Sequence, residues 1–283
     1  EKTIFEYEDI KGEALAVPVS NINPYLVDAP DLVLEKRNQP ICIVPTISYG
    51  SMANDDGHLL LDKEQRNALI AAEPATAPYI RRYMGAQEFL NNAERWCLWL
   101  KDISPSLMRS SNELRHRIEA VRKFRASSNR EATRNLAATP SLFGEDRQPL
   151  KSYLLLPKVS SENRPYMPIG FMPSEVIANG SALTISDSGH YEMGVLQSKM
   201  HMAWMRAVAG RMKSDYQYSA QIVYNNFPWP DLPEKLEPNQ PQTPTHKAQA
   251  AIEKAAQAVL DARAQFPGSS LADLYDPLTM PPA

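Results

Sequence analysis

Two short polar segments carry side chains whose hydrogen-bonding groups match the edges of DNA bases. The first is the loop Ser160-Ser161-Glu162-Asn163-Arg164, and the second is Gln197-Ser198-Lys199 together with His201. Arg and Lys donate to guanine, Asn and Gln pair with adenine, Glu accepts from the cytosine amine, and Ser serves several bases. The same residue types also occur in ordinary surface loops and on helix faces, so their composition alone leaves both interpretations open.

A basic stripe stands out from the acidic remainder of the chain. Between Arg109 and Arg134, eight Lys and Arg residues stand against three Glu, a local charge of +5. The net charge is −3, so the rest of the chain carries −8 (−3 minus +5). Attraction to phosphates depends on the charge of the face presented rather than on the total. We predict phosphate contacts from Arg109, Arg115, Arg122, Lys123, Arg125, Arg130, Arg134, Arg211 and Lys213.

The centre of this stripe is predicted to be an amphipathic helix over residues 111–125. Apolar residues recur there at helical spacing, at Leu114, Ile118, Val121 and Phe124. This spacing is expected to leave Arg115, Arg122 and Arg125 on or beside a shared exposed side. A solvated helix face explains the same pattern, whereas the continuation of positive charge beyond the helix favours phosphate contacts.

The motifs of a self-contained enzyme are missing from the sequence. There is no Gly-x-Ser-x-Gly, phosphate-binding Gly loop, His-Glu-x-x-His or Cys-x-x-Cys, and the histidines never fall at metal-ligand spacing. Glu145-Asp146-Arg147-Gln148 lacks the Asp and Glu-x-Lys pattern of nucleases, and residues 54–58 lack the distal Glu of a calcium loop. We therefore predict no catalytic residue and no metal site.

Asn23-Pro24-Tyr25 is similar to the Asn/Asp-Pro-Pro-Tyr/Phe motif with which amino-methyltransferases hold a target base. One proline is missing, and no Gly-rich cofactor loop precedes the segment. A turn set by Asn before Pro is therefore predicted.

The composition is that of an ordinary globular protein, for which we predict a cytoplasmic location. The 283 residues, 43% hydrophobic and 22% charged, suffice for one large or two modest domains. No run approaches the roughly 18 apolar residues that span a bilayer, and no signal peptide is apparent. Cys42 and Cys97 stand in apolar contexts and are predicted to be buried free thiols. The absence of an initial Met suggests a piece of a longer protein.

Hydrophobic periodicity predicts a mixture of strands and helices. Strands are expected at residues 32–34, 41–44, 59–61, 95–100, 153–157, 167–171 and 182–185. One helix is expected to begin after Asp62, an N-cap with Gln65 three residues later, and to end at Glu73. A continuous helix is expected from Tyr191 to Met212. Its core side is predicted to consist of Leu196, Met200, Ala203, Trp204, Ala207 and Val208.

The composition changes after Pro230, where a Pro-rich linker is predicted. Thr243 as N-cap and Pro244 in the first helical position then predict a last long helix, followed by a short helix near residues 271–275. The long helix has a narrow apolar seam that needs a partner surface, formed by Ala248, Ile252, Ala255, Val259, Ala262 and Phe266.

Several segments, taken in order, resemble the C-terminal part of one family of enzymes. They are Asn21-Ile22-Asn23-Pro24-Tyr25-Leu26-Val27-Asp28-Ala29-Pro30, Ser141-Leu142-Phe143-Gly144-Glu145-Asp146-Arg147-Gln148-Pro149, Ser160-Ser161-Glu162-Asn163-Arg164, Tyr166-Met167-Pro168-Ile169-Gly170-Phe171, Ser198-Lys199-Met200-His201-Met202-Ala203-Trp204 and Asn225-Asn226-Phe227-Pro228-Trp229-Pro230. The family is that of MmeI-type (type IIL) restriction-modification enzymes, which fuse an adenine methyltransferase to its own sequence reader. The resemblance covers nearly the whole chain.

The resemblance implies an α+β fold, a mixed strand and helix DNA target-recognition domain with a C-terminal helical segment. Residues 1–40 would be a connector from a methyltransferase domain absent from this chain, residues 41–230 the recognition domain, and residues 231–283 a Pro-rich linker and helical segment. The loop at 160–165 and the helix start at 197–201 resemble the places where family members meet base edges. Base assignments do not transfer, because residues there vary with the site being read.

The resemblance also implies the partners, duplex DNA and the methyltransferase domain of the same polypeptide, with no membrane. The chain would present one adenine to that domain for base flipping and methylation. S-adenosylmethionine, and magnesium if the parent protein is also a nuclease, would serve the parent, and no cofactor is predicted for this chain.

Two other functions compete with DNA recognition. The acidic net charge and the narrow seam of the last helix favour a non-enzymatic protein-interaction module, which salt-sensitive DNA binding would distinguish. A complete S-adenosylmethionine-dependent enzyme with an unrecognised site is the second alternative, and tight binding of that cofactor would support it.

Overall fold

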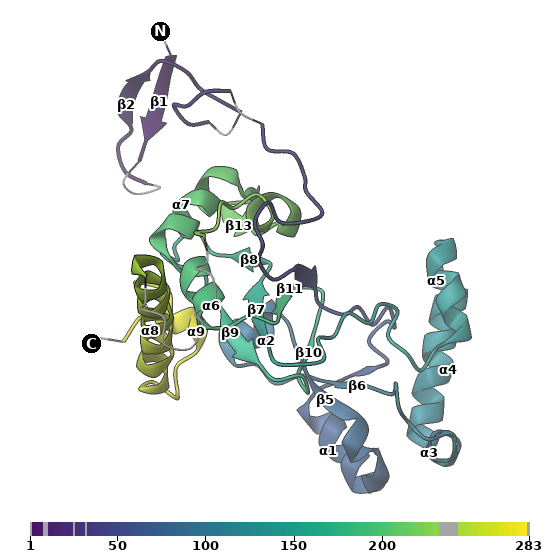
Figure 1. The fold of residues 1–283 in the computed structure, drawn as a ribbon. Helices are drawn as coiled ribbons and strands as arrows, with labels where there is room; N and C mark the ends of the chain where they lie inside the picture. The colour runs from purple at the N-terminus through teal and green to yellow at the C-terminus, as the bar shows by residue number, and fades with distance from the viewer. Residues whose placement is uncertain (1, 8–10, 25, 32, 232–242, 282–283) are drawn as a thin grey trace.

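The computed structural model describes residues 2–7, 11–24, 26–31, 33–231 and 243–281. Within these ranges helices and short, mostly antiparallel strands are mixed along the chain, and the predicted α+β class is confirmed (Figure 1). None of the helices in the described ranges is long and apolar enough to span a membrane.

The larger core forms around an antiparallel sheet with the strand order β3-β11-β7-β9. β7 (Tyr153–Pro157) and β11 (Ala182–Ser186) form its centre, with β3 (Ile47–Tyr49) and β9 (Gly170–Met172) at the edges. Every residue of β7 is buried. A strand covered on both faces has no solvent side, so its sequence is a continuous apolar run. The strands predicted at β7 and β11 are confirmed, whereas β9 begins later than expected.

A second sheet, β10-β5-β6-β4, carries a smaller core. β5 (Ile80–Met84) and β6 (Trp96–Leu98) pair antiparallel at its centre, flanked by β10 (Ile177–Ala178) and β4 (Leu60–Leu61). β10 pairs parallel to β5 and shortly precedes β11 of the first sheet in the chain. The two sheets are therefore tied together by the segment that connects these strands.

Two helices flank this second sheet. α1 (Lys63–Ala72) begins at the predicted capping box, in which the Asp62 carboxylate accepts the Gln65 N–H at 2.8 Å and the Gln65 side chain accepts the Asp62 N–H at 3.1 Å. These two bonds satisfy N–H groups that the helix start leaves without internal partners. α2 (Ala86–Asn91) follows β5 and buries its apolar side chains.

Three helices form an arm at one edge of the molecule (Figure 1). They are α3 (Pro105–Ser110), α4 (Asn112–Ala126) and α5 (Glu131–Asn135). The predicted amphipathic helix is confirmed as α4, and it packs on the core of the second sheet. Residues 105–135 are referred to below as the basic arm.

The helix predicted to run continuously from Tyr191 to Met212 is two helices. α6 (His190–Leu196) ends at Gln197, and the Ser198 hydroxyl caps α7 (Lys199–Val208) by accepting the His201 N–H at 3.1 Å. Ser favours this position because its side chain replaces the missing helical acceptor. The new helix buries a different set of residues, and Met200 is 72% exposed instead of facing the core. The buried residues of α7 are His201, Met202, Met205 and Val208.

A hairpin follows α7 where helix was expected. β12 (Gly210–Met212) and β13 (Asp215–Gln217) pair antiparallel, and β8 (Val159–Ser160) completes a three-stranded sheet with the order β12-β13-β8.

The C-terminal helices form as predicted. α8 (Pro244–Ala264) begins at the Thr243 cap, and α9 (Leu271–Leu274) is the short helix. α8 lies along α6 (Figure 1). Its seam is shifted by one position from the prediction, with Ile252, Ala256 and Leu260 packed on the larger core while Ala255 and Val259 stay exposed. Most of the predicted linker, residues 232–242, lies outside the described residues.

The N-terminal region differs from the extended connector that was predicted. β1 (Lys2–Glu6) and β2 (Leu15–Val19) form an antiparallel hairpin. Residues 33–34 are not in a strand, and residue 32 lies outside the described residues. The expected turn begins at Asn23, because the Leu26 N–H donates to the Asn23 carbonyl at 2.9 Å. Residue 25 lies outside the described residues.

The strand predicted at residues 41–44 is also absent. Cys42 and Val44 pack against the larger core while Ile43 is fully exposed. These residues therefore alternate between core and solvent as in a strand, but the segment is irregular and pairs with no sheet.

Candidate nucleic-acid interface

The sheet β12-β13-β8 brings two polar turns to one end. Tyr216 of β13 lies opposite Ser160 of β8, and the two strands run in opposite directions. The loop that leaves β8 after Ser160 therefore lies at the same end of the sheet as the turn of the β12–β13 hairpin. Residues 161–165 and the hairpin turn at Lys213 and Ser214 are consequently neighbours.

Ser160 does not belong to the exposed part of this loop, contrary to the prediction that it reads bases. It is 2% exposed because its pairing with β13 turns the side chain into the protein. Ser161 shapes the turn, its hydroxyl accepting the Asn163 N–H at 3.3 Å and its carbonyl accepting the Arg164 N–H at 3.2 Å. Asn163 is exposed and Glu162 is half-buried, so these two residues form the tip of the loop.

Arg164 is half-buried and is influenced by the charges of two acidic residues from other segments. Burial lowers the pKa of its guanidinium, whereas the charges of Asp276 and Asp215 raise it. Its Nε is buried without a hydrogen-bond partner in the described part of the chain. The loop is therefore coupled electrostatically to the hairpin, through Asp215, and to the C-terminal segment, through Asp276.

Gln197 and His201, both predicted to contact bases, are buried, and their side chains bind other residues of the chain. The Gln197 amide donates to the Met167 carbonyl at 2.9 Å and to the Tyr275 hydroxyl at 2.8 Å. His201 Nε2 lies 2.9 Å from the Tyr218 hydroxyl. Burial lowers the pKa of His201 to about 3, so the imidazole is neutral at physiological pH. The helix break at Ser198 is the cause, because it turns the start of α7 and directs His201 inward.

Lys199 is the exposed cation at this helix start. Ser198 lies beside it, but its hydroxyl is engaged in capping α7. Lys199 is two residues from Gln197, whose amide binds the carbonyl of Met167 just beyond the polar loop. The loop and the helix start therefore lie close together, as the predicted shared role requires.

The hairpin adds two cations to this region. The Arg211 guanidinium lies 3.9 Å from the centre of the Tyr216 ring and donates to the Ser214 carbonyl at 2.8 Å. Lys213 is exposed in the left-handed turn conformation, with a φ of 58°. The name polar edge is used below for the half-buried to exposed residues 161–164 together with the exposed cations Lys199, Arg211 and Lys213.

The basic arm presents most of its predicted phosphate-contacting cations to solvent. Arg115 donates to the Asn112 side chain at 2.5 Å, and Arg122 lies 3.7 Å from Glu119. Exposed pairs of this kind are weak, so these side chains can reorient toward a phosphate at little cost. The exposed cations are Arg109, Arg115, Arg122, Lys123, Arg130 and Arg134.

Arg125 is fully buried, which contradicts its predicted role as a phosphate contact. Residues 114, 118, 121 and 125 repeat at helical spacing and form the buried face of α4, whereas Phe124, predicted to be apolar core, is 37% exposed. Burial lowers the pKa of the guanidinium and Asp55 raises it. The guanidinium donates at 2.7 to 3.0 Å to the carbonyls of Ala53, Asn54, Leu136, Thr139 and Leu142.

The polar edge and the basic arm lie far apart. In Figure 1 α7 and β13 are at the upper left and centre, while α4 and α5 are at the far right. Two distinct cationic surfaces are thus presented, one with mixed donors and acceptors and one formed by cations on a helical arm.

Both cysteines are free thiols, and neither belongs to the polar edge or the basic arm. No cluster of three or more His, Cys, Asp or Glu suited to a metal ion occurs among the residues that the structure describes. Cys97 is a buried thiol whose pKa is raised by burial, whereas Cys42 is only half-buried, contrary to prediction. Tyr275 and Arg263 were not singled out from the sequence. The Tyr275 hydroxyl binds Gln197 from far along the chain and also accepts from Arg263, and no local spacing signals these contacts.

Comparison with known protein families matches almost the whole chain. The family described as MmeI, target recognition domain, matches residues 28–231, and the family described as MmeI, C-terminal domain, matches residues 244–283.

Two similar proteins are known in more detail. DNA methyltransferase A of Bacillus subtilis (strain 168) is 36% identical over 263 residues, which are 93% of this chain and 28% of that protein. The solved structure of the type IIL restriction-modification enzyme MmeI in complex with DNA is 45% identical, with a TM-score of 0.90. The match covers 99% of this chain and 36% of the MmeI chain. This chain therefore spans about a third or less of the length of either relative, and it belongs to the family of MmeI target recognition domains, continued by an MmeI C-terminal domain.

Proposed function

We propose that this chain is the sequence-specific DNA recognition part of a restriction-modification adenine methyltransferase. The observation that carries the proposal is its similarity, over 99% of its length and at 45% identity, to an MmeI enzyme solved with DNA. The exposed cations of the polar edge and of the basic arm support it. The chain positions duplex DNA, and a domain outside this chain flips and methylates the adenine.

The two surfaces have different tasks in this proposal. The basic arm, Arg211 and Lys213 bind phosphates, which sets the position of the protein without reading sequence. Glu162, Asn163, Arg164 and Lys199 meet base edges, where a well-paired contact contributes about 1–3 kcal/mol of discrimination. Flipping the adenine costs a few kcal/mol, so a reader that holds the flanking bases supports that step.

S-adenosylmethionine supplies the methyl group in the methyltransferase domain, and magnesium serves the parent protein if it also cuts DNA. The sequence Asn23-Pro24-Tyr25 lacks the second proline of the base-holding motif, and a turn begins at Asn23. We therefore assign no step of methyl transfer to residues of this chain.

The methyltransferase domain of the same polypeptide is the second proposed partner. The β1–β2 hairpin supports it, because Phe5 and Leu15 are 59% and 65% exposed and an isolated two-stranded hairpin is at best marginally stable in water. Packing of this hairpin against the methyltransferase domain would bury those side chains. A cytoplasmic location, where DNA is accessible, accords with this function.

Binding of a labelled duplex by this chain tests the proposal. Affinity is expected to fall steeply between about 50 and 200 mM salt because phosphate binding releases counterions. The double variant Arg115→Gln, Arg122→Gln removes two exposed arm cations. It is expected to weaken binding on every sequence and to lower the slope of log affinity against log salt by roughly 1 for each phosphate that is no longer neutralised.

The matched control is Lys63→Gln, Lys151→Gln, which also removes two exposed positive charges but at sites away from both surfaces. It is expected to leave the salt slope within error of the unmodified chain. Binding that is indifferent to salt, or equal weakening by the two double variants, would reject the role assigned to the basic arm.

A further inference from the structure

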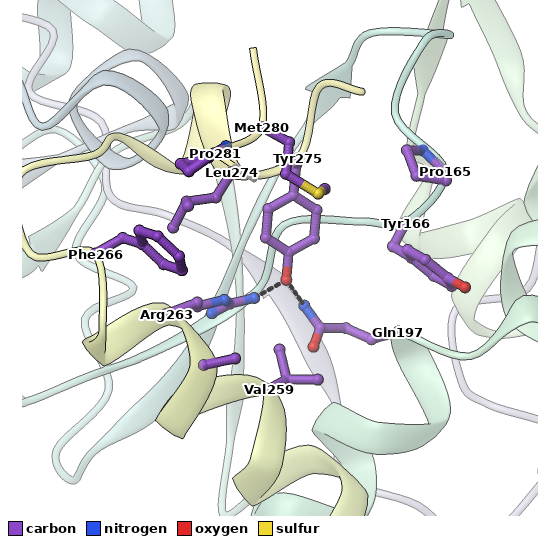
Figure 2. A pocket seen from close by; sticks show the side chains of 11 residues that line it. Pro165, Tyr166, Gln197, Val259, Arg263, Phe266, Leu274, Tyr275, Met280 and Pro281 are labelled. Carbon is purple, nitrogen blue, oxygen red and sulfur yellow. Dashed lines mark hydrogen bonds between the residues drawn. The ribbon is translucent and has the colours of Figure 1, made fainter. Parts of the chain in front are cut away.

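The C-terminal segment reaches the break between α6 and α7 through a single hydroxyl. The Tyr275 oxygen accepts the Gln197 amide at 2.8 Å and also accepts a hydrogen bond from the Arg263 guanidinium. Figure 2 shows this oxygen between the two side chains, with both bonds drawn. Arg263 also donates to the Ile169 carbonyl at 2.7 Å and lies over the Tyr275 ring.

The helices that carry Gln197 and Arg263 are packed tightly against each other. Gly194 faces α8 at the centre of α6, and a Cβ there would lie 2.7 Å from Ile252 Cγ2 and 3.0 Å from the Ile252 carbonyl. Ala256 of α8 is 2% exposed at the same place. The close approach holds α8, and with it Arg263, in a fixed position against α6.

Gln197 links the two segments assigned to base reading. Its backbone ends α6, and the next two residues are the cap of α7 and the exposed Lys199. Its side chain donates to the Met167 carbonyl, just beyond the polar loop. A shift of the Gln197 side chain therefore moves the helix start and the loop relative to each other.

The packing is less complete around the Gln197, Arg263 and Tyr275 side chains themselves. A cavity of 380 Å³ lies beside the three side chains, between Pro165 and Tyr166 on one side and Phe266 and Met280 on the other (Figure 2). Its walls are mainly apolar, so the hydroxyl of Tyr275 is the polar group that spans from the C-terminal segment to Gln197.

We propose that Tyr275 is a positioning residue for base reading, which fixes the geometry of Lys199 relative to residues 161–164 through Gln197. The inference rests on the proposed function and adds a task for the C-terminal segment, which contacts no base itself in this scheme. Loss of the Tyr275 hydroxyl is therefore expected to weaken discrimination between DNA sequences. General affinity for DNA is expected to stay unchanged. The phosphate-binding arm lies on the other side of the molecule and does not depend on Tyr275.

The test uses the natural full-length protein that contains this chain, with Tyr275→Phe, which keeps the ring and removes only the hydroxyl. Methylation-motif mapping of the unmodified protein identifies the recognised sequence. Affinity is then measured for that sequence, for duplexes with one changed base pair, and for unrelated DNA. We expect Tyr275→Phe to lower discrimination against changed base pairs by about 3- to 10-fold, the effect of one hydrogen bond. Affinity for unrelated DNA and its salt slope are expected to stay unchanged.

Tyr153→Phe is the matched control, because it also removes one buried phenolic hydroxyl, which donates to the Val176 carbonyl at 2.6 Å in a different core cluster. Both variants are expected to lose thermal stability, and only Tyr275→Phe is expected to discriminate less well. Amide hydrogen exchange gives a second readout. It is expected to accelerate at residues 161–166 and 197–200 in Tyr275→Phe and to stay unchanged there in Tyr153→Phe.

The possible failures are distinguishable. If the unmodified protein does not discriminate between DNA sequences, the proposed function is wrong and this inference is overturned with it. If the unmodified protein discriminates and Tyr275→Phe discriminates equally well, only the positioning role is overturned. An equal loss of discrimination in Tyr153→Phe would also overturn it, because the effect would then follow from a general decrease in stability.

Discussion

The role of a polar side chain in this protein depends on its surroundings, and Arg125 is the clearest case. Its side chain has no carboxylate within ion-pair distance among the described residues and instead donates to five carbonyls from two loops. The carbonyls come from residues 53–54 and 136–142, which precede and follow α4 in the chain. Arg125 is therefore the hydrogen-bonding centre that holds both loops against the arm.

Arg125→Ala is expected to lower the free energy of unfolding by roughly 3–5 kcal/mol, because five buried carbonyls lose their donor. Arg125→Lys is expected to lower the free energy of unfolding nearly as much, because one ammonium cannot donate to the same five carbonyls. Urea unfolding measures both. Arg122→Ala on the exposed side is the control and is expected to stay within about 0.5 kcal/mol. A stable Arg125→Ala variant with impaired DNA affinity would restore the original phosphate-binding hypothesis.

His201 makes stability depend on pH. Burial lowers its pKa from the ordinary 6.5 to about 3. Between these values the unfolded chain binds a proton that the folded chain does not, so stability falls as the pH falls below 6.5. The decrease between pH 7 and pH 5 is roughly 2 kcal/mol. His201→Gln is expected to flatten this part of the pH dependence, as measured by urea unfolding at several pH values.

The exposed His116 provides the comparison for His201. His116→Gln is expected to leave the pH dependence as it is, because it removes an exposed imidazole and keeps the buried one at position 201. If the two variants give the same curve between pH 5 and 7, His201 is not the group responsible.

Among the elements, α6 and α8 approach each other closely at Gly194. Alanine in place of glycine stabilises a helix by about 1 kcal/mol. At position 194, however, the added Cβ would lie 2.7 Å from Ile252 Cγ2. Overpacking costs about 1–3 kcal/mol in such places, so the steric effect is expected to outweigh the helical preference. The seam that the sequence left without a partner is thus covered by a helix of the same chain.

Gly194→Ala is expected to lower the thermal unfolding temperature and to loosen the C-terminal segment. Adding Ile252→Ala removes the clashing Cγ2, so the two substitutions are expected to be less than additive in a double-mutant cycle. Gly210→Ala is the control, because its nearest neighbour to a new Cβ is the end of a side chain at 3.8 Å. Full additivity of the two changes would show that α6 and α8 do not constrain each other at this point.

The break between α6 and α7 shows that a short capping signal can interrupt a longer helical pattern. Residues 191–212 have apolar residues at helical spacing throughout, which predicted one helix. Ser198 carries a capping signal within that run, and the structure uses it. Because the cap reorients the second helix, the error also reversed the predicted exposure of Met200 and His201.

On the scale of the whole molecule, the charge distribution accounts for the low net charge of a proposed DNA reader. The positive charge of residues 109–134 is concentrated on an arm at one side, and the polar edge carries its own cations on the other. A net charge of −3 is compatible with two cationic surfaces because the acidic residues lie mostly elsewhere. The C-terminal segment, through α8 and α9, joins the larger core to the loop side of the polar edge.

The sequence by itself determined the features that depend on neighbours along the chain. The caps at Asp62 and Thr243, the buried run of β7 and the order of motifs that identifies the family are all local, and all are confirmed. Only the tertiary structure decided which polar residues face solvent. A guanidinium can donate its hydrogen bonds to water or to carbonyls from distant loops, as Arg125 does. The Gln197 amide could likewise donate to water but donates to Met167 and Tyr275. Burial is set by segments far away in sequence, so Arg125, Gln197 and His201 could not be told from surface residues until those segments were in place.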